Sequence, residues 1–224
     1  MQPYFLPYIG YWQLIKAVDK YVIYDDVNYI KGGWINRNNF LINSEKRLFT
    51  ILLNDASPNK RINEITIKDD FRKFLKMVQL SYSKAPYYNY VMPLMESVCH
   101  YDEKGVSLFL YHSMQQILSY LDIHTELILS SEIQKNNNLK GQDKILEICS
   151  LLSATEYINA EGGQVLYDRD TFQKKGIKLR FLECGNINYK QWNNKFISNL
   201  SILDVLMFNS KQDVNILLDN FSLI

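Results

Sequence analysis

The amino-acid sequence predicts an α/β fold in which a mainly parallel sheet is flanked by helices. Short apolar runs alternate with amphipathic runs in the first 25 residues and again between residues 125 and 182. Strand, helix, strand steps of this kind favour parallel pairing through right-handed crossovers. Two additions interrupt the alternation: a β-hairpin after residue 40, and a helical insertion at about residues 70–122. We expect residues 1–224 to form a single domain, since one domain of this size buries enough apolar surface to fold.

Composition narrows the classes of function. The chain has 25 basic and 24 acidic residues, so no overall field attracts nucleic acid, and we expect no nucleic-acid partner. Its three cysteines are widely spaced, which argues against a disulfide framework and suits a reducing compartment. No apolar run approaches the roughly 20 residues of a membrane-spanning helix. We therefore expect a soluble, cytoplasmic protein that acts on a small molecule.

The first 26 residues contain a loop, a helix and a strand. Pro3 and Pro7 lie in the loop, residues 9–18 repeat apolar side chains at helical spacing, and Tyr21 to Tyr24 form a short apolar strand. A loop of this kind usually follows the first strand of a βα unit, so we expect an apolar strand upstream of Met1. The strand at residues 21–24 ends in two carboxylates, where an α/β sheet usually presents its chemistry. Asp26 is accordingly a candidate catalytic residue, although aspartate also ends strands as a plain turn residue.

The next loop, residues 27–38, combines glycines with an indole, cations and carboxamides. Its glycine pair, Gly32-Gly33, allows close approach of the backbone. An indole stacks on a sugar or base, while cations and amides hold phosphate or hydroxyl oxygens. The alternative is a loop whose tryptophan belongs to the core and whose charges are solvated. On the first interpretation, the substrate-binding candidates are Lys31, Trp34, Asn36 and Arg37.

Periodicity assigns most of the remaining chain. Apolar runs on either side of a polar turn at residues 43–46 predict the hairpin. Helical spacing recurs in three parts of the middle and final thirds, and the last eleven residues also resemble a small helix. The helices are expected at residues 71–82, 103–121 and 141–152, and the later strands at residues 125–129, 156–160 and 177–182.

Two further stretches supply candidate site residues. Glu161 follows a predicted strand and precedes Gly162 and Gly163, which places a carboxylate and free backbone amides at a strand end; a plain turn is the alternative. Ser201 begins a predicted helix and Asp204 lies in its first turn. A helix cap with an apolar docking face is the favoured interpretation of this segment, and a catalytic Asp204 is the alternative. The three histidines are isolated, so we expect no metal site, and no cofactor is indicated.

The order of these early elements loosely resembles the nucleotidylyltransferase superfamily, in which a His-x-Gly-His box opens a helix. The corresponding residues here are Tyr8, Ile9, Gly10 and Tyr11. Tyrosine replaces both histidines, which removes cationic donors for a phosphoryl transition state. This comparison therefore implies fold kinship and makes Tyr8, Gly10 and Tyr11 binding candidates, with nucleotidyl transfer as an alternative activity.

A second resemblance spans nearly the whole chain. The segment PYFLPYIGYWQLIKAVDKYVIYDDVNYIKGGWINRN is similar to the opening signature of the WbqC-like family, which is associated with bacterial O-antigen and surface-polysaccharide gene clusters. Later segments are similar too: KGQDKILEI, YINAEGGQVLY, GIKLRFL and FISNLSILDVL. The resemblance implies a transferase that moves an amino-acid or acyl group, with glycine one candidate, onto an amino sugar.

These observations combine into one hypothesis about geometry. The glycine-flanked loop with Trp34 and Arg37 and the acidic turn at Glu161 are expected to line a common cleft that binds an amino sugar or sugar nucleotide. Asp26 or Glu161 then accepts a proton from the attacking amine. The alternative from another class is a non-catalytic protein that holds a sugar nucleotide or a partner enzyme.

Overall fold

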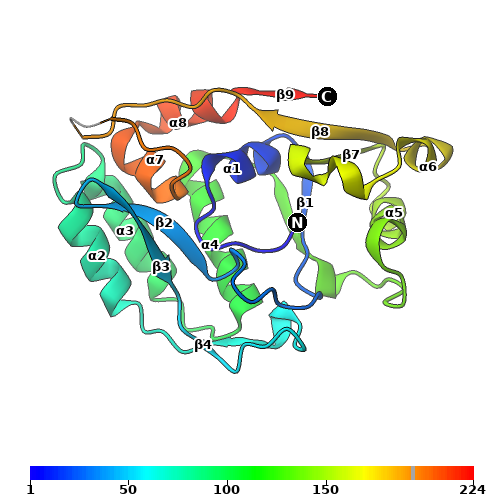
Figure 1. Cartoon of the computed structure of the whole chain (residues 1–224), viewed down its shortest axis with the longest axis horizontal. Helices are drawn as coiled ribbons and strands as arrows, with labels where there is room; N and C mark the ends of the chain where they lie inside the picture. Colours follow the sequence, from blue (N-terminus) through cyan, green and yellow to red (C-terminus); the bar gives the residue numbers. More distant parts are fainter. Residues whose placement is uncertain (193–194) are drawn as a thin grey trace.

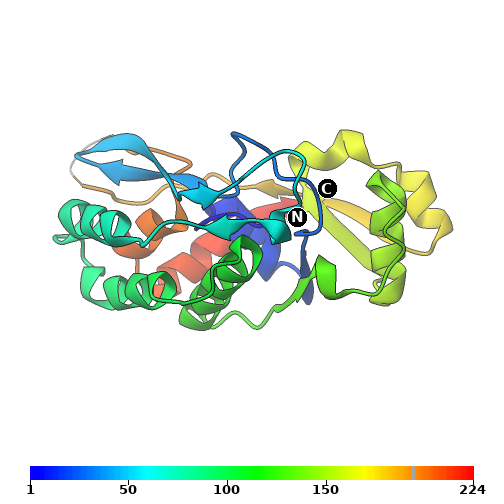
Figure 2. The same cartoon turned by 90° about the horizontal axis from the view of Figure 1, so that it is seen from below.

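The computed structural model describes residues 1–192 and 195–224, and Figure 1 shows an elongated molecule. The first residues of the chain lie between two groups of elements in both views (Figures 1 and 2). Helices α2, α3 and α4 lie in one group, and α5 and α6 stand at the far end of the other. The helices are α1 (Ile9–Lys16), α2 (Arg72–Tyr82), α3 (Tyr88–Cys99), α4 (Val106–Leu121), α5 (Gly141–Leu151), α6 (Arg169–Lys174), α7 (Ile202–Phe208) and α8 (Lys211–Leu218).

The strands form small sheets, and the expected mainly parallel sheet is wrong. Two parallel pairs are present, β1 with β6 and β7 with β8, but β2 with β3, β4 with β5 and β8 with β9 are antiparallel. β7 and β8 pair across a strand, helix, strand step that was expected, whereas β1 pairs with β6 from a distant part of the chain. The hairpin turn gives the antiparallel pair of β2 with β3, and the returning C-terminal chain gives that of β8 with β9. The strands are β1 (Lys20–Ile23), β2 (Arg37–Ile42), β3 (Glu45–Thr50), β4 (Leu53–Asn54), β5 (Thr66–Ile67), β6 (Glu126–Leu129), β7 (Glu156–Ala160), β8 (Lys178–Cys184) and β9 (Phe221–Leu223).

The helix expected over the last eleven residues is wrong for the end of the chain, which forms a strand. Helix α8 ends at Leu218, and the chain then turns through Asp219 and Asn220 into β9. At the other terminus, the Met1 nitrogen donates to the Val22 carbonyl (2.8 Å), and the Met1 carbonyl accepts from the Tyr24 nitrogen (2.7 Å). The main chain at Met1 therefore lies along the edge of β1.

The hairpin is present, with a longer first strand, a second strand that begins earlier in the chain, and a shorter turn than expected. Ile42 pairs with Glu45, which leaves Asn43 and Ser44 as a two-residue turn. Both have positive φ, 51° and 63°, as a type I′ turn requires. The primed turn matches the twist of the strands, so pairing continues to the turn itself.

The core of the larger group is aromatic and centres on the N-terminal loop. Phe5 is fully buried and packs against Phe40, Phe74 and Phe109, with ring centroids 6.4, 5.3 and 6.3 Å away. Aromatic pairs at such separations add to the stabilisation from buried area.

Among the described residues no helix combines the length and apolar character needed to cross a membrane.

Hydrogen bonds from distant elements fix the same loop. The Asn38 Nδ2 amide at the start of β2 donates to the carbonyls of Phe5 and Leu6, and Ser201 Oγ also donates to the Leu6 carbonyl (2.8 Å). The Trp12 indole donates to the Pro7 carbonyl (3.1 Å). Leu6 has a φ of 43°, a left-handed conformation that costs a leucine energy. The surrounding bonds therefore hold the loop in a shape it would not adopt alone.

We predict that Asn38→Ala lowers the free energy of unfolding by about 2–3 kcal/mol, because it leaves a buried carbonyl without a donor. Urea denaturation measures this change. Asn39→Ala is the matched control, since the half-buried Asn39 follows Asn38 in β2 and we expect a change within about 0.5 kcal/mol. Equal losses in the two variants would contradict the role assigned to Asn38.

Candidate functional site

The ends of the parallel strands gather polar residues. Ile23 pairs with Leu129 at the ends of β1 and β6, and Asp25 and Ser130 follow them. Ala160 pairs with Leu182 in the second parallel pair, so the chain after β7 and the end of β8 lie together. The carboxyl edge of parallel strands is where open α/β sheets bind ligands.

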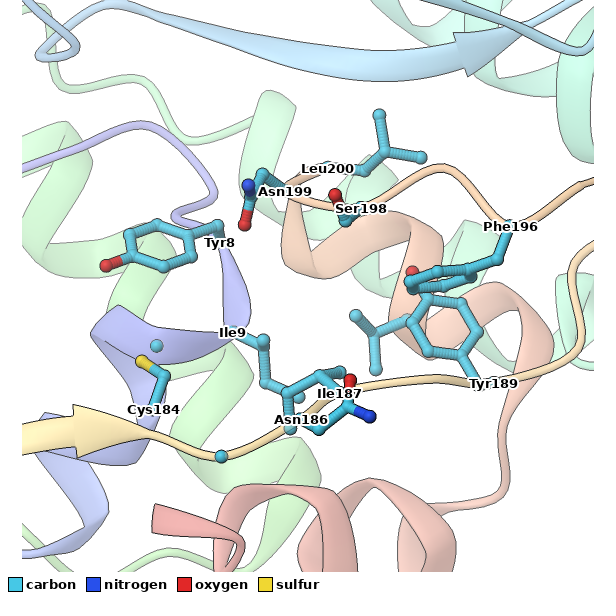
Figure 3. Close-up of a pocket in the computed structure, with 13 residues that line it drawn as sticks. Tyr8, Ile9, Cys184, Asn186, Ile187, Tyr189, Phe196, Ser198, Asn199 and Leu200 are labelled. Atoms are coloured by element: carbon cyan, nitrogen blue, oxygen red, sulfur yellow. The ribbon is translucent and has the colours of Figure 1, made fainter. Parts of the chain in front are cut away.

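A cavity of about 200 Å³ lies where the N-terminal end of α1 meets the chain after β8. Figure 3 shows Tyr8 and Cys184 at one end of the cavity and Tyr189 and Phe196 at the other. Its walls mix aromatic and apolar side chains with uncharged polar groups, a combination typical of small-molecule sites. The lining residues include Tyr8, Ile9, Gly10, Cys184, Asn186, Ile187, Tyr189, Phe196, Ser198, Asn199 and Leu200.

The first turn of α1 brings Tyr8 and Gly10 to this cavity. Tyr8 precedes the helix in extended conformation, and Gly10 is its second residue. A Cβ at Gly10 would lie 2.5 Å from Cys184 Sγ and 2.6 Å from a ring carbon of Tyr8. Glycine is therefore needed for the close approach of β8 to the helix, and both predicted residues line the cavity.

Buried groups behind the cavity fix the position of Tyr189. The Asp204 carboxylate has no exposed surface and accepts hydrogen bonds from Tyr189 Oη (2.7 Å), Gln191 Nε2 (2.8 Å) and Tyr82 Oη (3.0 Å). Gln191 in turn bonds both the nitrogen and the carbonyl of Ile197. Asp204 thus joins two segments of the cavity wall.

The pKa of Asp204 is raised because the carboxyl is buried, although its three hydrogen-bond donors partly counteract this effect. Ser201 lies beside it as the cap of α7, where its Oγ accepts from the Leu203 nitrogen (3.2 Å). The structure places both predicted residues inside the protein, where they hold the chain in position.

Glu161 lies near the Cys184 end of the cavity. Burial raises the pKa of the Cys184 thiol, and the Glu161 charge raises it further, so the thiol stays protonated at neutral pH. Glu161 is itself exposed and begins the short helical turn η3 (Glu161–Leu166). A Cβ at Gly163 would lie 3.0 Å from Asn159 Nδ2, whereas Gly162 faces open space.

The loop before β2 presents an exposed tryptophan beside a cation. Trp34 is 48% exposed, so it is not sealed in the core. The Arg37 guanidinium lies 5.5 Å from the centroid of the Trp34 ring. The centroids of the Tyr4 and Trp34 rings are 5.9 Å apart. Arg37 Nε is buried and has no hydrogen-bond partner in the described part of the chain. Lys31 is exposed on the same loop. This arrangement is suited to stacking a ring and holding an anion.

Two predicted binding residues are used for internal bonds instead. The Asn36 side chain is buried; it accepts from Tyr29 Oη (2.9 Å) and donates to the Ile51 carbonyl (2.8 Å). Tyr11 is also buried, and its hydroxyl donates to the Gln2 carbonyl (2.8 Å). Sequence pattern does not separate such side chains from ligand-binding ones, because both types are polar and lie in the same loop.

Tyr4 and Tyr8 belong to the N-terminal loop, where burial and neighbouring groups change their pKa values. Burial raises the pKa of Tyr4; the nearby Tyr8 raises it further, while Arg37 lowers it. Burial and Cys184 raise the pKa of Tyr8. Tyr8 and Cys184 line the cavity, whereas Arg37, Trp34 and Glu161 are not among its lining residues. A cleft shared by the Trp34 loop and the Glu161 turn therefore stays a prediction.

Asp26 lies elsewhere on the edge, between two lysines that the sequence pattern did not indicate. Its Oδ2 is 2.9 Å from Lys135 Nζ and 3.1 Å from Lys144 Nζ, and both lysine side chains are at least nine-tenths buried. Burial raises the pKa of Asp26, but the two lysine ammonium groups and the nearby Ser130 hydroxyl lower it by more, so the carboxyl stays ionised. More than a hundred residues separate Asp26 from these lysines, so no local pattern links them.

Asp25 has a separate, structural role. Its carboxylate accepts from Ser107 Oγ (2.8 Å) and from both the nitrogen (2.9 Å) and the Oγ (2.8 Å) of Ser131. These bonds tie the end of β1 to α4 and to the segment after β6.

Within residues 1–192 and 195–224, no three His, Cys, Asp or Glu side chains gather as a metal site would require.

The fold and this edge define an α/β protein whose N-terminal loop borders a cavity of about 200 Å³. A model of the WbqC-like protein family matches residues 2–216. The chain is also 26% identical over 215 residues to the uncharacterized protein Rv1507c of Mycobacterium tuberculosis (strain ATCC 25618 / H37Rv), covering 93% of this chain and 91% of that protein. No solved structure matches. The chain belongs to the WbqC-like protein family, which confirms the resemblance at the family level.

We predict that Gly10→Ala lowers the free energy of unfolding by about 1–3 kcal/mol, because the added methyl overpacks the contact among Tyr8, Cys184 and α1. Gly162→Ala is the control, since nothing lies within 4 Å of its added Cβ. Urea denaturation of both variants tests the contact. A Gly10→Ala protein as stable as Gly162→Ala would contradict the packing described here.

We predict that Asp26→Asn lowers the free energy of unfolding at pH 7 by about 3–5 kcal/mol, because two buried ammonium groups lose their counter-charge. The folded-state pKa of Asp26 is depressed, so its ionised form stabilises the protein above the unfolded pKa of about 3.9. This stabilisation is lost as pH falls through the folded pKa. The difference between wild type and variant should therefore shrink below about pH 4, and a difference independent of pH would refute the assignment.

Proposed function

We propose that the protein is a transferase that moves an amino-acid or acyl group onto an amino sugar during the assembly of a bacterial surface polysaccharide. The observation that carries this proposal is the cavity between Tyr8 and Tyr189, with the exposed carboxylate of Glu161 near one end. In this proposal the cavity receives the sugar ring. Asn186, Ser198 and Asn199 supply amide and hydroxyl groups that suit a ring rich in hydroxyls.

The remaining predicted residues then bind the rest of a sugar nucleotide. Arg37 and Lys31 hold phosphate oxygens, and Trp34 stacks on a flat ring. The half-buried guanidinium supports this role, since its Nε hydrogen has no partner in the described residues. Gly162, which faces open space, leaves room beside Glu161 for the second substrate, whereas Gly163 packs against Asn159.

Glu161 is the better candidate for the general base. Asp26 is ionised but bound by two lysines, which lower its pKa and its affinity for a proton. Glu161 is exposed and has no salt-bridge partner in the part of the chain that the structure describes. In this mechanism Asp204 is a positioning residue, because it reaches the cavity through Tyr189.

The proposed reaction is an acyl transfer. The amine nitrogen of the acceptor sugar attacks the carbonyl carbon of an activated ester or thioester, and Glu161 takes the proton that the nitrogen loses. A C–N bond forms, and the bond from the carbonyl carbon to oxygen or sulfur breaks. The leaving alcohol or thiol receives the proton from Glu161, which restores the carboxylate.

Nucleotidyl transfer, the alternative enzymatic activity, finds less support. Tyr8 lines the cavity, but Tyr11 points into the core, where its hydroxyl is bonded to the Gln2 carbonyl. Tyr11, which replaces the second histidine of the nucleotidylyltransferase box, therefore offers no group to a phosphate.

The proposed activity is tested with UDP- and dTDP-linked amino sugars and the coenzyme A thioesters of acetate and glycine. Thiol release and mass spectrometry of the amide product measure turnover. We expect turnover with at least one pair, and we expect Glu161→Gln to lower kcat/KM by about two to four orders of magnitude, as removal of a general base does.

Glu183→Gln is the matched control. Glu183 is an exposed carboxylate next to Cys184 that accepts from Ser222 Oγ (3.2 Å), so its loss should change kcat/KM by less than about twofold. Equal effects of the two substitutions would remove Glu161 from the mechanism. Binding of an amino-sugar nucleotide without any turnover would replace the transferase with the non-catalytic alternative.

A further inference from the structure

A second polar site lies around Asp26, among residues that do not line the cavity. Two ammonium groups, those of Lys135 and Lys144, share one oxygen of this carboxylate. The other oxygen, Asp26 Oδ1, is buried and has no hydrogen-bond partner in the described chain. Buried polar atoms are nearly always paired, so this unpaired acceptor needs an explanation.

The two lysines differ in how fully they are bonded. Lys135 Nζ donates to Asp26, to the Ser130 carbonyl and to the Ile133 carbonyl (3.4 Å), which accounts for its three hydrogens. Lys144 Nζ has Asp26 as its hydrogen-bond acceptor among the described residues, and it lies 5.1 Å from the centroid of the Tyr24 ring. Lys144 therefore keeps donor capacity for another acceptor.

Ser130 adds a second unpaired group at the same place. It has no exposed surface, and its Oγ makes no hydrogen bond of good geometry within the described residues. The hydroxyl nevertheless lies beside the Asp26 carboxyl and helps to lower its pKa. An unpaired donor, an ammonium with spare hydrogens and an unpaired carboxylate oxygen thus converge at the end of β1 and β6.

The start of α5 adds positive potential near this cluster. Lys144 lies in the first turns of this helix, and helical side chains lean toward the N-terminal end. The N-cap residue, Lys140, makes no side-chain cap hydrogen bond. Gly141 has a φ of 52°, and no other part of the described chain lies within 4 Å of the position that a Cβ would take there, so neighbouring elements leave the helix start uncovered.

We propose that this cluster binds a phosphate group that retains one proton. Two phosphate oxygens accept from Lys144 Nζ and Ser130 Oγ, and the phosphate hydroxyl donates to Asp26 Oδ1. The retained proton is the distinguishing feature: a fully deprotonated anion would meet the lone pairs of Asp26 Oδ1 with no hydrogen between them. Sulfate, which carries no proton at neutral pH, therefore fits the site poorly.

Isothermal titration with inorganic phosphate, in a phosphate-free buffer at pH 7, tests this site without any sugar or acyl donor. The result is thus independent of the proposed transferase activity. We expect saturable binding of phosphate and at least tenfold weaker binding of sulfate and acetate. Sulfate binding as tight as phosphate would overturn the proposal, because charge alone would then explain the affinity.

Two variants locate the binding. Lys144→Met should abolish phosphate binding, whereas Lys211→Met, at the start of α8, should leave it unchanged. Lys144→Met also removes a buried charge, so Ser130→Ala serves as a second variant that keeps every ion pair. We expect Ser130→Ala to fold with wild-type stability and to weaken phosphate binding about tenfold. Wild-type phosphate affinity in Ser130→Ala would place the anion elsewhere and refute the site.

Discussion

The carbonyl oxygen of Leu6 is the point on which the architecture depends. It accepts from Asn38 Nδ2 at the start of β2 and from Ser201 Oγ at the cap of α7, two elements far apart in sequence. Leu6 has the positive φ that a leucine avoids, so these bonds compensate for a strained backbone. Because the loop is fixed there, Phe5 points into the aromatic core and Tyr8 lies at the cavity. One strained residue thus couples the core to the candidate site.

Local pattern predicted the features that are encoded locally. Helix α1 and the hairpin follow from short-range periodicity. Gly10 was only a binding candidate, and its close approach to Cys184 and Tyr8 became visible in the structure. The two-residue turn at Asn43 and Ser44 was missed because these residues supply positive φ without a glycine. The sheet arrangement was also missed, because the pairing of a strand with its neighbour depends on the rest of the fold.

Pattern could not identify the partners of the buried charges. Asp26 was a candidate because it follows a strand, but its two lysines come from distant segments, and only the fold brings them together. Asp204 had a catalytic and a structural interpretation, and its three buried donors favour the structural one. The same contacts give the cavity a preorganised wall, since Tyr189 is held by a carboxylate that solvent does not reach.

The central claim is that the cavity between Tyr8 and Tyr189 receives the sugar of an amino-sugar nucleotide. A crystal structure of the protein soaked with UDP-glucosamine tests it most directly. We predict density for the sugar ring between these two tyrosines, with the diphosphate toward Arg37. Density for the nucleotide on another face, with the cavity filled by ordered water, would contradict it.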